Sequence, residues 1–530
     1  MKTTYQRLPA AQDRLLTAII HTAPTSQGGG ELARYDYTYN AQRQIATWRQ
    51  AQPGMAAKEW AIAYDARQQV SAVVETPVAG PPQNPQQVWR YQYDASGNRI
   101  AAQEGSRTRT ATYNELNQLV SQTAGGSTWF RGKVNEPANV TINGQNARVS
   151  ADGTFESLTT VGAGQQDVTM QATDKAGNTT SQTWRVDNGP AGTTTTTHDA
   201  EGNLLTDGRY IYTWDARNRM TSVTLGPDTW TFTYDGQNRR IAESKNGQPV
   251  RTWVWSGTSV LEERAANGSN QREWSGGQEQ LNVNNQQTGK QLMLTDHLES
   301  TRVVVDGISG ITLASYFYRP WGRRDCILGI NNANSGYTGH LWHESGLSLA
   351  VFRPYDPETG RWPSRDPIEE RGGRNLYLYC NADSMNKSDH LGLECGVTWH
   401  RSPVGLSQGA INVGHEWAEI KGQGYGFWPT PGTNIWLTTG FVYHGNDPYT
   451  GKRDGQNWET ERIIDHPLYN TLRGGKASGK KVKCATCEEI TDCIREVFKE
   501  WDGAIYSLPY QNCRDAVFTV LFMRCGLRKK

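Results

Sequence analysis

The chain has 530 residues, with a formal net charge of +1 at pH 7. This length predicts three or four domains, and the near-neutral charge provides no overall field that would attract nucleic acid or a membrane surface. No apolar run approaches the roughly 20 residues needed to cross a bilayer, and residues 1–24 lack the basic start and apolar stretch of a signal peptide.

The composition favours a mostly β protein. Hydrophobic residues make up 36% of the chain and the mean hydropathy is -0.70, yet aromatic residues reach 10% and glycine occurs 55 times. Trp and Tyr suit short, twisted, half-buried strands, and Gly, Asn and Asp supply turns. Disordered chains are poor in aromatic residues, so we expect only short polar segments, such as residues 193–197, to be loops.

A repeat runs through the first 250 residues. In each copy an aromatic residue precedes Asp or Asn, a short polar turn and an apolar β-forming segment. Each copy predicts a hairpin, and because one hairpin cannot bury its own face, stacked copies must form a continuous sheet. The pairs are Tyr39-Asn40, Tyr64-Asp65, Tyr93-Asp94, Tyr113-Asn114, Trp214-Asp215 and Tyr234-Asp235.

Residues 132–189 interrupt the repeats and contain no such pair. Alternating strand segments with Asn-Gly, Asp-Gly and Ala-Gly-Asn turns predict a small β-sandwich. The segment resembles bacterial Ig-like domains. We expect a structural role, with adhesion as the alternative.

The repeats resemble the YD repeats of Rhs proteins and of insecticidal toxin-complex C components. Five later segments follow the Rhs-associated core in order, so that the resemblance covers most of residues 30–393. It implies a long β-strip that spirals into a hollow shell around a toxin. The five segments are LTDHLESTRVVVD from Leu294, SYFYRPWGR from Ser315, YTGHLWHESGL from Tyr337, RPYDPETGRWPSRDPI from Arg353 and NLYLYCNADSMNKSDHLGL from Asn375.

The same resemblance implies a self-cleavage site at the end of the core. Asp366, Asp389 and Arg353 match the residues with which the family cuts its chain after the tripeptide LGL, here at Leu393–Glu394. Two close carboxylates cannot both ionise cheaply, so one serves as acid while the other activates water. Alone, Asp-Pro and Asp-His would simply predict turns.

One position departs from the family. His390 stands where Pro usually follows the second Asp. Proline fixes φ and restricts the preceding residue, so the change puts the efficiency of cleavage in question.

The region after Leu393 has a different character. Six of the eight cysteines lie there, and residues 487–501 predict an amphipathic helix. Residues 414–429 predict a hairpin with His415 near its start, and residues 506–526 predict a loop leading into a helix that begins near Cys513. A helix N-terminus lowers the pKa of a thiol and favours the thiolate, whose proton a histidine across a cleft can take.

This order of His on a strand before Cys on a helix resembles circularly permuted papain-like hydrolases of the NlpC and PPPDE type. The resemblance implies Cys513 as nucleophile and His415 as base, with Asn512 or the Cys513 amide supporting an oxyanion hole. No third catalytic residue is evident. Alternatively Cys513 is a buried small hydrophobe, and His444 or His466 is the base.

We expect neither a cofactor nor a catalytic metal. Cys484, Cys487, Cys493 and His466 could together bind a structural zinc, but there is no second CxxC, so reduced thiols or a disulfide are favoured. The basic run at residues 480–483 lies in a tail of nearly balanced charge, which favours a solvated loop.

We therefore expect a mostly β fold with four parts: YD repeats in 1–131, an Ig-like insert in 132–189, YD repeats and core in 190–393, and an α+β papain-like toxin in 394–530. The expected function is an Rhs-type effector of interbacterial competition that releases a Cys-His hydrolase. Such a toxin implies an immunity protein, export by a non-Sec route such as type VI secretion, and action in the target cell. The alternatives are a YD-repeat surface protein with a non-catalytic tail, or a nuclease toxin.

Overall fold

A computed structural model describes residues 1–393 except 10–11, 13–14, 25–28, 79–86, 276–277, 284–285 and 330–332. Beyond them it describes the backbone of 397–403, 414–420, 423–429, 438–444 and 505–506. Within these ranges the regular structure is almost entirely antiparallel sheet. The mostly β fold is therefore confirmed, whereas the expected α+β tail and its helix at 487–501 lie largely outside the described residues.

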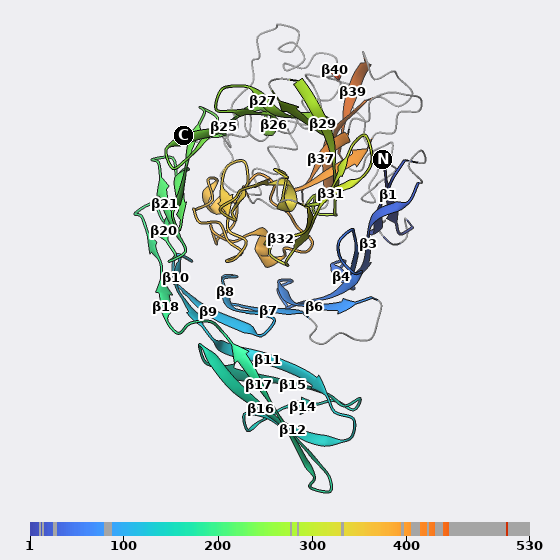
Figure 1. Cartoon of the computed structure of the whole chain (residues 1–530), viewed down its shortest axis with the longest axis vertical. Coiled ribbons are helices and arrows are strands. Elements are labelled where there is room, and N and C mark those ends of the chain that lie inside the picture. The colour runs from blue at the N-terminus through green and yellow to red at the C-terminus, as the bar shows by residue number, and fades with distance from the viewer. Residues whose placement is uncertain are drawn as a thin grey trace.

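Two long sheets form one strip (Figure 1), in which nearly every strand pairs with its neighbour in sequence. The first sheet has 11 strands: β1 (Lys2–Arg7), β2 (Leu16–Thr22), β3 (Glu31–Tyr39), β4 (Ile45–Ala51), β5 (Lys58–Tyr64), β6 (Val70–Pro77), β7 (Val88–Tyr93), β8 (Arg99–Glu104), β9 (Arg107–Tyr113), β10 (Leu119–Ala124) and β18 (Thr193–Thr195). The second sheet has 14: β19 (Thr197–His198), β20 (Leu204–Thr206), β21 (Tyr210–Trp214), β22 (Met220–Leu225), β23 (Asp228–Tyr234), β24 (Arg240–Lys245), β25 (Gln248–Ser256), β26 (Ser259–Ala265), β27 (Asn270–Ser275), β28 (Gln278–Val283), β29 (Gln286–Thr295), β30 (Thr301–Asp306), β31 (Thr312–Tyr318) and β32 (Arg324–Gly329).

The aromatic residue of each repeat fastens one hairpin to the preceding one. Tyr64 donates its hydroxyl to the carbonyl of Ile45, at 2.8 Å, and Tyr93 does the same to Val70, at 2.7 Å. A Trp can replace Tyr because its indole N–H reaches the same kind of carbonyl. The equivalent bonds join Tyr39 to Leu16, Tyr113 to Arg99, Trp214 to Leu204, Tyr234 to Met220 and Trp255 to Arg240.

The Asp or Asn that follows closes the turn. Asp65 Oδ1 accepts the main-chain N–H groups of Arg67 and Gln69, both at 2.9 Å. These bonds satisfy turn donors that have no partner in the ladder. The same pair of bonds recurs at Asn40, Asp94, Asn114, Asp215, Asp235 and Asp296.

The third residue after the Asp or Asn adopts a left-handed conformation, as a type I turn with a G1 bulge requires. Glycine or asparagine fills this position in several repeats, including Gly97 (φ +83°) and Asn117 (φ +60°). Arg43 and Gln68, both at φ +66°, carry a side chain poorly suited to it.

Replacing Gln68 by asparagine should therefore stabilise the strip. Asparagine tolerates the left-handed region better than glutamine, so the substitution should raise the free energy of unfolding by about 1 kcal/mol or less. Urea unfolding followed by tryptophan fluorescence measures the change. The neighbouring turn residue Ala66 has no positive φ, so Ala66→Asn is the matched control. An equal gain in both variants would contradict the conformational explanation.

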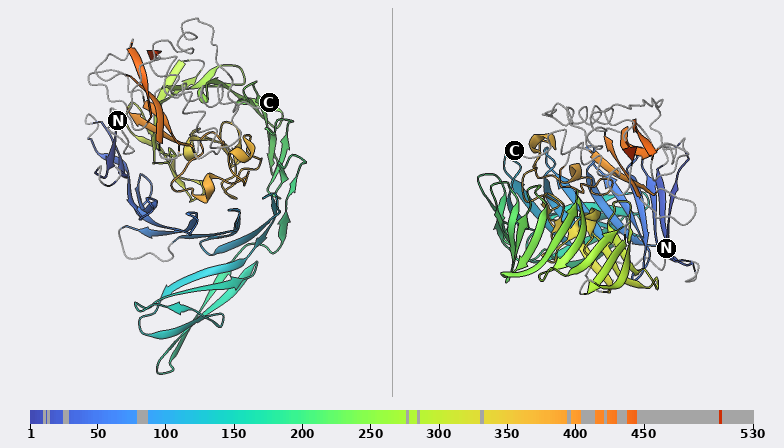
Figure 2. Two further views of the ribbon diagram at one scale, coloured as in Figure 1. Left: turned by 180° about the vertical axis from the view of Figure 1, so that it is seen from behind. Right: turned by 90° about the horizontal axis from the view of Figure 1, so that it is seen from above.

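The insert interrupts the strip between β10 and β18, which pair directly with one another. It contains a three-stranded and a four-stranded sheet and projects from the ring (Figure 1; Figure 2, left). Its strands are β11 (Gly126–Lys133), β12 (Ala138–Ile142), β13 (Gln145–Asn146), β14 (Arg148–Val149), β15 (Thr154–Val161), β16 (Gln165–Asp174) and β17 (Thr179–Asp187).

The insert is bonded to the outside of the strip. Both amide atoms of Gln103 bond the main chain of Trp129, at 2.8 and 3.0 Å, and the Arg90 guanidinium stacks on the Trp129 ring. Gly125 marks the junction: its φ is +88°, and a Cβ there would lie 2.7 Å from the Val161 carbonyl oxygen.

The strip curls so that its last strands pack face to face inside its first ones. His21 Nε2 donates to the Thr295 carbonyl at 2.9 Å, and Gln52 Nε2 donates to Ser315 Oγ at 2.8 Å. Between the layers lies an aromatic core in which Trp48 and Trp60 make an edge-to-face contact at 5.2 Å. Seen from above, the strands stand side by side as a wall (Figure 2, right).

The segment from residue 333 to 393 lies inside this wall (Figure 1). It has little regular structure and is held by hydrogen bonds to the repeats, for example from Arg361 Nη1 to Asn98 Oδ1 and from the Tyr377 hydroxyl to the Gly202 carbonyl. Its elements are η3 (Tyr337–Gly339), β33 (Leu341–Trp342), β34 (Ser348–Leu349), β35 (Pro354–Tyr355), η4 (Glu369–Arg371) and η5 (Cys380–Ala382).

The tail contributes one five-stranded sheet to the described residues, made of β36 (Val397–Pro403), β37 (Gly414–Ile420), β38 (Gln423–Pro429), β39 (Thr438–His444) and β40 (Ile505–Tyr506). β37 and β38 pair antiparallel, which confirms the hairpin expected around His415.

Candidate functional site

Arg353, Asp366 and Asp389 meet inside the segment that the strip surrounds. All three are buried, with exposed fractions of 1%, 5% and 7%. Arg353 Nη2 donates to Asp366 Oδ2 at 2.8 Å and lies 3.6 Å from Asp389 Oδ2. The two carboxylates therefore reach the same guanidinium nitrogen, although 23 residues separate them in sequence.

The chain immediately before the expected scissile bond is held by hydrogen bonds to both Asp389 and Arg353. Asp389 Oδ1 accepts the N–H groups of Gly392 and Leu393, at 2.8 and 2.9 Å. Arg353 Nε donates to the Gly392 carbonyl at 2.6 Å. These bonds fix the peptide unit between Gly392 and Leu393, directly before the expected scissile bond.

The charge state of Asp389 is set by opposing effects. Burial raises the pKa of this carboxyl above its ordinary value, against the Arg353 cation and the N–H groups of Leu393 and Gly392, which lower it. Within the described part of the chain, Asp389 Oδ2 accepts no hydrogen bond. A raised pKa favours the protonated form of this buried carboxyl more than in an ordinary aspartate.

Two histidines border Asp389. His340 Nε2 donates to the Asp389 main-chain carbonyl at 2.8 Å, and His390 Nδ1 donates to the Thr338 carbonyl at 2.9 Å. Burial, followed by the charge of His390, lowers the pKa of His340 to about 3, so its ring is neutral. Sequence reasoning gave His340 no role, although it lies in the YTGH motif quoted for the core.

The remaining predicted residues fall elsewhere. Leu393 is described, but Glu394 is not, so the far side of the expected scissile bond lies outside the described residues. His415 is placed only by its backbone, in β37 opposite Ser402 of β36. Cys513 and Asn512, like His466 and the cysteines at 484, 487 and 493, lie outside the described ranges.

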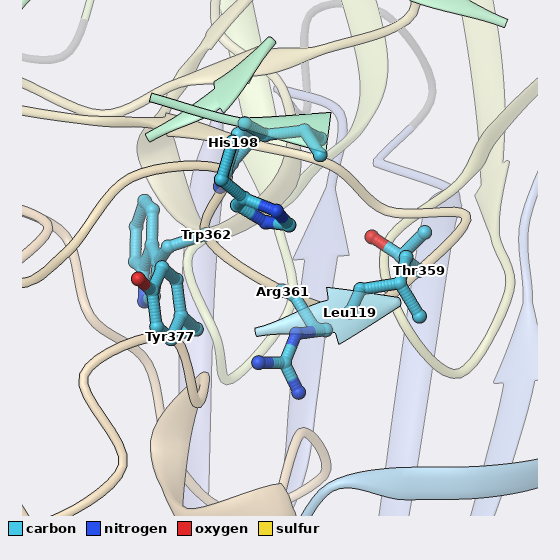
Figure 3. A pocket seen from close by; sticks show the side chains of 8 residues that line it. Leu119, His198, Thr359, Arg361, Trp362 and Tyr377 are labelled. Carbon is cyan, nitrogen blue, oxygen red and sulfur yellow. The ribbon is translucent and has the colours of Figure 1, made fainter. Parts of the chain in front are cut away.

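Two of the cavities in the described structure adjoin the site and the insert, respectively. One, of about 20 Å³, is enclosed by His198, Arg361, Trp362, Tyr377 and neighbouring side chains (Figure 3) and has room for about one water molecule. Trp362 also lies 4.3 Å below the Arg353 guanidinium, so this cavity adjoins the site. The other, of about 190 Å³, lies where the insert meets the outside of the strip.

The described residues contain no group of three or more His, Cys, Asp or Glu side chains arranged to bind a metal ion. Among the same residues no helix has both the length and the apolar character that crossing a membrane requires.

Comparison with known proteins identifies toxin and nuclease relatives. The chain is 27% identical to the tRNA3(Ser)-specific nuclease WapA of Bacillus spizizenii over 253 residues, 45% of this chain and 11% of the relative. It is 25% identical to the double-stranded DNA deaminase toxin A of Burkholderia cenocepacia, over 34% of this chain and 16% of the relative. It is 29% identical to the probable deoxyribonuclease RhsB of Dickeya dadantii, over 34% of this chain and 13% of the relative.

The chain thus spans less than a fifth of the length of these relatives. The WapA match, over 253 residues, is longer than residues 394–530, so part of it lies before residue 394. The family model described as glucodextranase, domain B, matches residues 123–189, which include every strand of the insert. A structural match to the crystal structure of TcdB2-TccC3-Cdc42 covers 72% of this chain and 22% of that chain. The sequence identity is 16% and the TM-score is 0.32.

Another buried acid in the enclosed segment, Asp356, provides a pH-dependent test of the fold. Burial, and next the neighbouring Asp207, raise the pKa of Asp356 from 3.8 to about 6. Below pH 6 the folded chain takes up a proton here that the unfolded chain takes up only near pH 4. The free energy of unfolding should therefore increase as the pH falls from 7 to 4, by up to about 3 kcal/mol from this group.

Unfolding by urea at pH 7, 6, 5 and 4 measures this contribution as the difference between the wild type and Asp356→Asn, in which it is absent. If the difference between the two proteins stays constant over this range, the pKa of Asp356 is not raised in the folded chain.

Proposed function

We propose that the protein is an Rhs-type toxin of interbacterial competition whose enclosed segment cuts the chain between Leu393 and Glu394. The cluster of Arg353, Asp366 and Asp389 beside Leu393 is the observation that carries this proposal. The similarity to WapA, Rhs and deaminase toxins supports the toxin role. The division into YD repeats, insert, YD repeats with core up to residue 393, and a tail from residue 394 belongs to the same proposal, with the insert beginning at β11 (Gly126–Lys133) instead of at residue 132.

The reaction is a hydrolysis of the peptide bond. Asp366, whose carboxylate accepts a hydrogen bond from Arg353, takes a proton from water, and the resulting hydroxide oxygen attacks the Leu393 carbonyl carbon. Asp389, whose pKa is raised by burial, gives its proton to the Glu394 nitrogen as the bond breaks. The products are a carboxyl group at Leu393 and a new amino group at Glu394. Because the substrate is part of the same chain, its effective concentration is very high.

Asp366→Asn and Asp389→Asn should each leave the 530-residue chain uncut, with a rate loss of at least about 100-fold, the usual contribution of general acid–base catalysis. A denaturing gel and N-terminal sequencing of the smaller fragment follow the reaction. Asp356→Asn is the matched control, since Asp356 is equally buried but is not among the groups bonded to Arg353. Wild-type cleavage in either Asp366→Asn or Asp389→Asn would reject the aspartate pair.

The freed tail is proposed to be an enzyme that acts in the target cell, neutralised in the producer by an immunity protein and exported by a non-Sec route such as type VI secretion. In the first version it is a papain-like hydrolase with Cys513 as nucleophile, His415 as base and Asn512 in support. In the second it is a nuclease, favoured by the nuclease and deoxyribonuclease names of its relatives. These names support the second version as strongly as the Cys-His pattern supports the first.

Expression of the chain in bacteria separates the two versions. A hydrolase should lose its toxicity in Cys513→Ala and in His415→Ala while cellular RNA and DNA stay intact; Cys525→Ala, in an apolar stretch, is the matched cysteine control. A nuclease should degrade RNA or DNA in all of these variants. Growth rate and nucleic-acid gels are the measurements, and unimpaired growth with the wild type would reject both versions.

A further inference from the structure

The main chain of Asp389 is held by a side chain from a distant part of the enclosed segment. His340 is 2% exposed, and its Nε2–H donates to the Asp389 carbonyl at 2.8 Å. Because a carbonyl oxygen only accepts, the proton of the neutral ring lies on Nε2. Within the described residues Nδ1 has no hydrogen-bond partner, so the bond to Asp389 is the main polar contact of this buried ring.

The bond holds the main chain from which the Asp389 carboxylate extends. The carboxylate can rotate about the Cα–Cβ bond of Asp389. Its position therefore depends on a fixed main chain and on the hydrogen bonds that it accepts from the N–H groups of Gly392 and Leu393. Catalytic groups need placement within about 0.5 Å, and a misplacement of about 1 Å can cost about 100-fold in rate.

The residue before His340 contributes by lacking a side chain. Gly339 has φ +74°, and a Cβ there would lie 2.5 Å from His390 Cε1 and 2.7 Å from His390 Nδ1. The imidazole of His390 therefore packs against the bare backbone of Gly339, from which its Nδ1 reaches the Thr338 carbonyl at 2.9 Å. This packing explains how the chain accommodates His390 at the position where proline is usual in the family that the core resembles.

The turn of residues 338–340 is itself strained and braced. Thr338 is not glycine yet has φ +49° and is 1% exposed. Its amide donates to Ser300 Oγ at 3.0 Å, which ties the turn to the loop between β29 and β30. Strained backbone of this kind persists only where the surroundings over-determine it, and it concentrates at functional sites.

We propose that the turn 338–340 is the positioning element of the self-cleavage site: His340 fixes the main chain of Asp389, and Gly339 provides the space in which His390 docks. Neither residue touches the reacting atoms; both act through Asp389. This inference rests on the proposed self-cleavage.

The role of His340 is tested with two variants of the full chain. His340→Gln places an amide N–H where Nε2–H stands, whereas His340→Phe keeps the ring volume and removes the donor. Cleavage is followed by pulse–chase during cell-free translation. We expect His340→Phe to cut about 100-fold more slowly than the wild type and His340→Gln to recover most of that loss. Wild-type cleavage in His340→Phe would overturn the proposal.

The role of Gly339 is tested by a double-mutant cycle. Gly339→Ala should slow cleavage about 100-fold in the natural chain, because the new Cβ displaces His390 and with it Asp389. In the His390→Ala background the same substitution should have less than about a threefold effect, since the ring that it would meet is gone. An equal loss in both backgrounds would mean that Ala is harmful only through its φ, and would overturn the docking role.

Failure of this inference differs from failure of the proposed function. If the wild type itself is never cut, or if Asp389→Asn is cut normally, the self-cleavage proposal fails. If the wild type is cut and Asp389→Asn is not, while His340→Phe matches the wild type, only the positioning role fails. Urea unfolding of each variant shows whether a slow variant still folds.

Discussion

The buried guanidinium of Arg353 organises the end of the enclosed segment. A cation that is 1% exposed must find partners for its donors, because a buried unpaired charge is strongly destabilising. Arg353 binds the carbonyls of Gly392 and Leu376, the carboxylate of Asp366 and the face of Trp362. Stretches of chain almost 40 residues apart converge on one side chain, so the local fold and the candidate site depend on the same cation.

Around this segment the shell follows a local rule. The Tyr hydroxyl bonds and Asp-capped turns join residues at most 23 positions apart, and each uses a residue type visible in the sequence, as at Tyr64 and Asp65. This is why the pattern of aromatic residue, Asp or Asn, and polar turn predicted the hairpins and their stacking. The curl of the strip follows no such rule. Contacts such as His21 with Thr295 join isolated residues that no period marks.

The start of the insert was equally hidden in the sequence. The absence of aromatic–Asp or aromatic–Asn pairs placed the change at residue 132, whereas β11, which pairs with β15 of the insert, begins at Gly126. The physical mark of the junction is Gly125, where the backbone approaches Val161 too closely for any side chain. A glycine in a chain with 55 of them gives no such signal by itself.

For the site, the motif resemblance supplied Arg353, Asp366 and Asp389, because their spacing along the chain is family-specific. The resemblance did not supply the contacts that these residues make, because those contacts depend on the fold. Examples are the hydrogen bond from Arg353 to the Gly392 carbonyl and the hydrogen bond from His340 to the Asp389 carbonyl. The sequence around His340 does not indicate a role, because a histidine near a threonine occurs in many structural settings. Only the contact of His340 with the Asp389 main chain points to one.

The enclosed segment also depends on the shell for its shape. With so little regular structure of its own, it takes its position from bonds to the repeats, such as those from Asn386 to the amide of Ile45 and to the Tyr64 hydroxyl, and from Tyr377 to Gly202. Hairpins form from local contacts and need no partner far along the chain, whereas the cluster around Arg353 needs these long-range anchors in place. The cluster around Arg353 is therefore complete only where the strip is in place, and under the proposed self-cleavage a chain is cut only after the wall around the segment has formed.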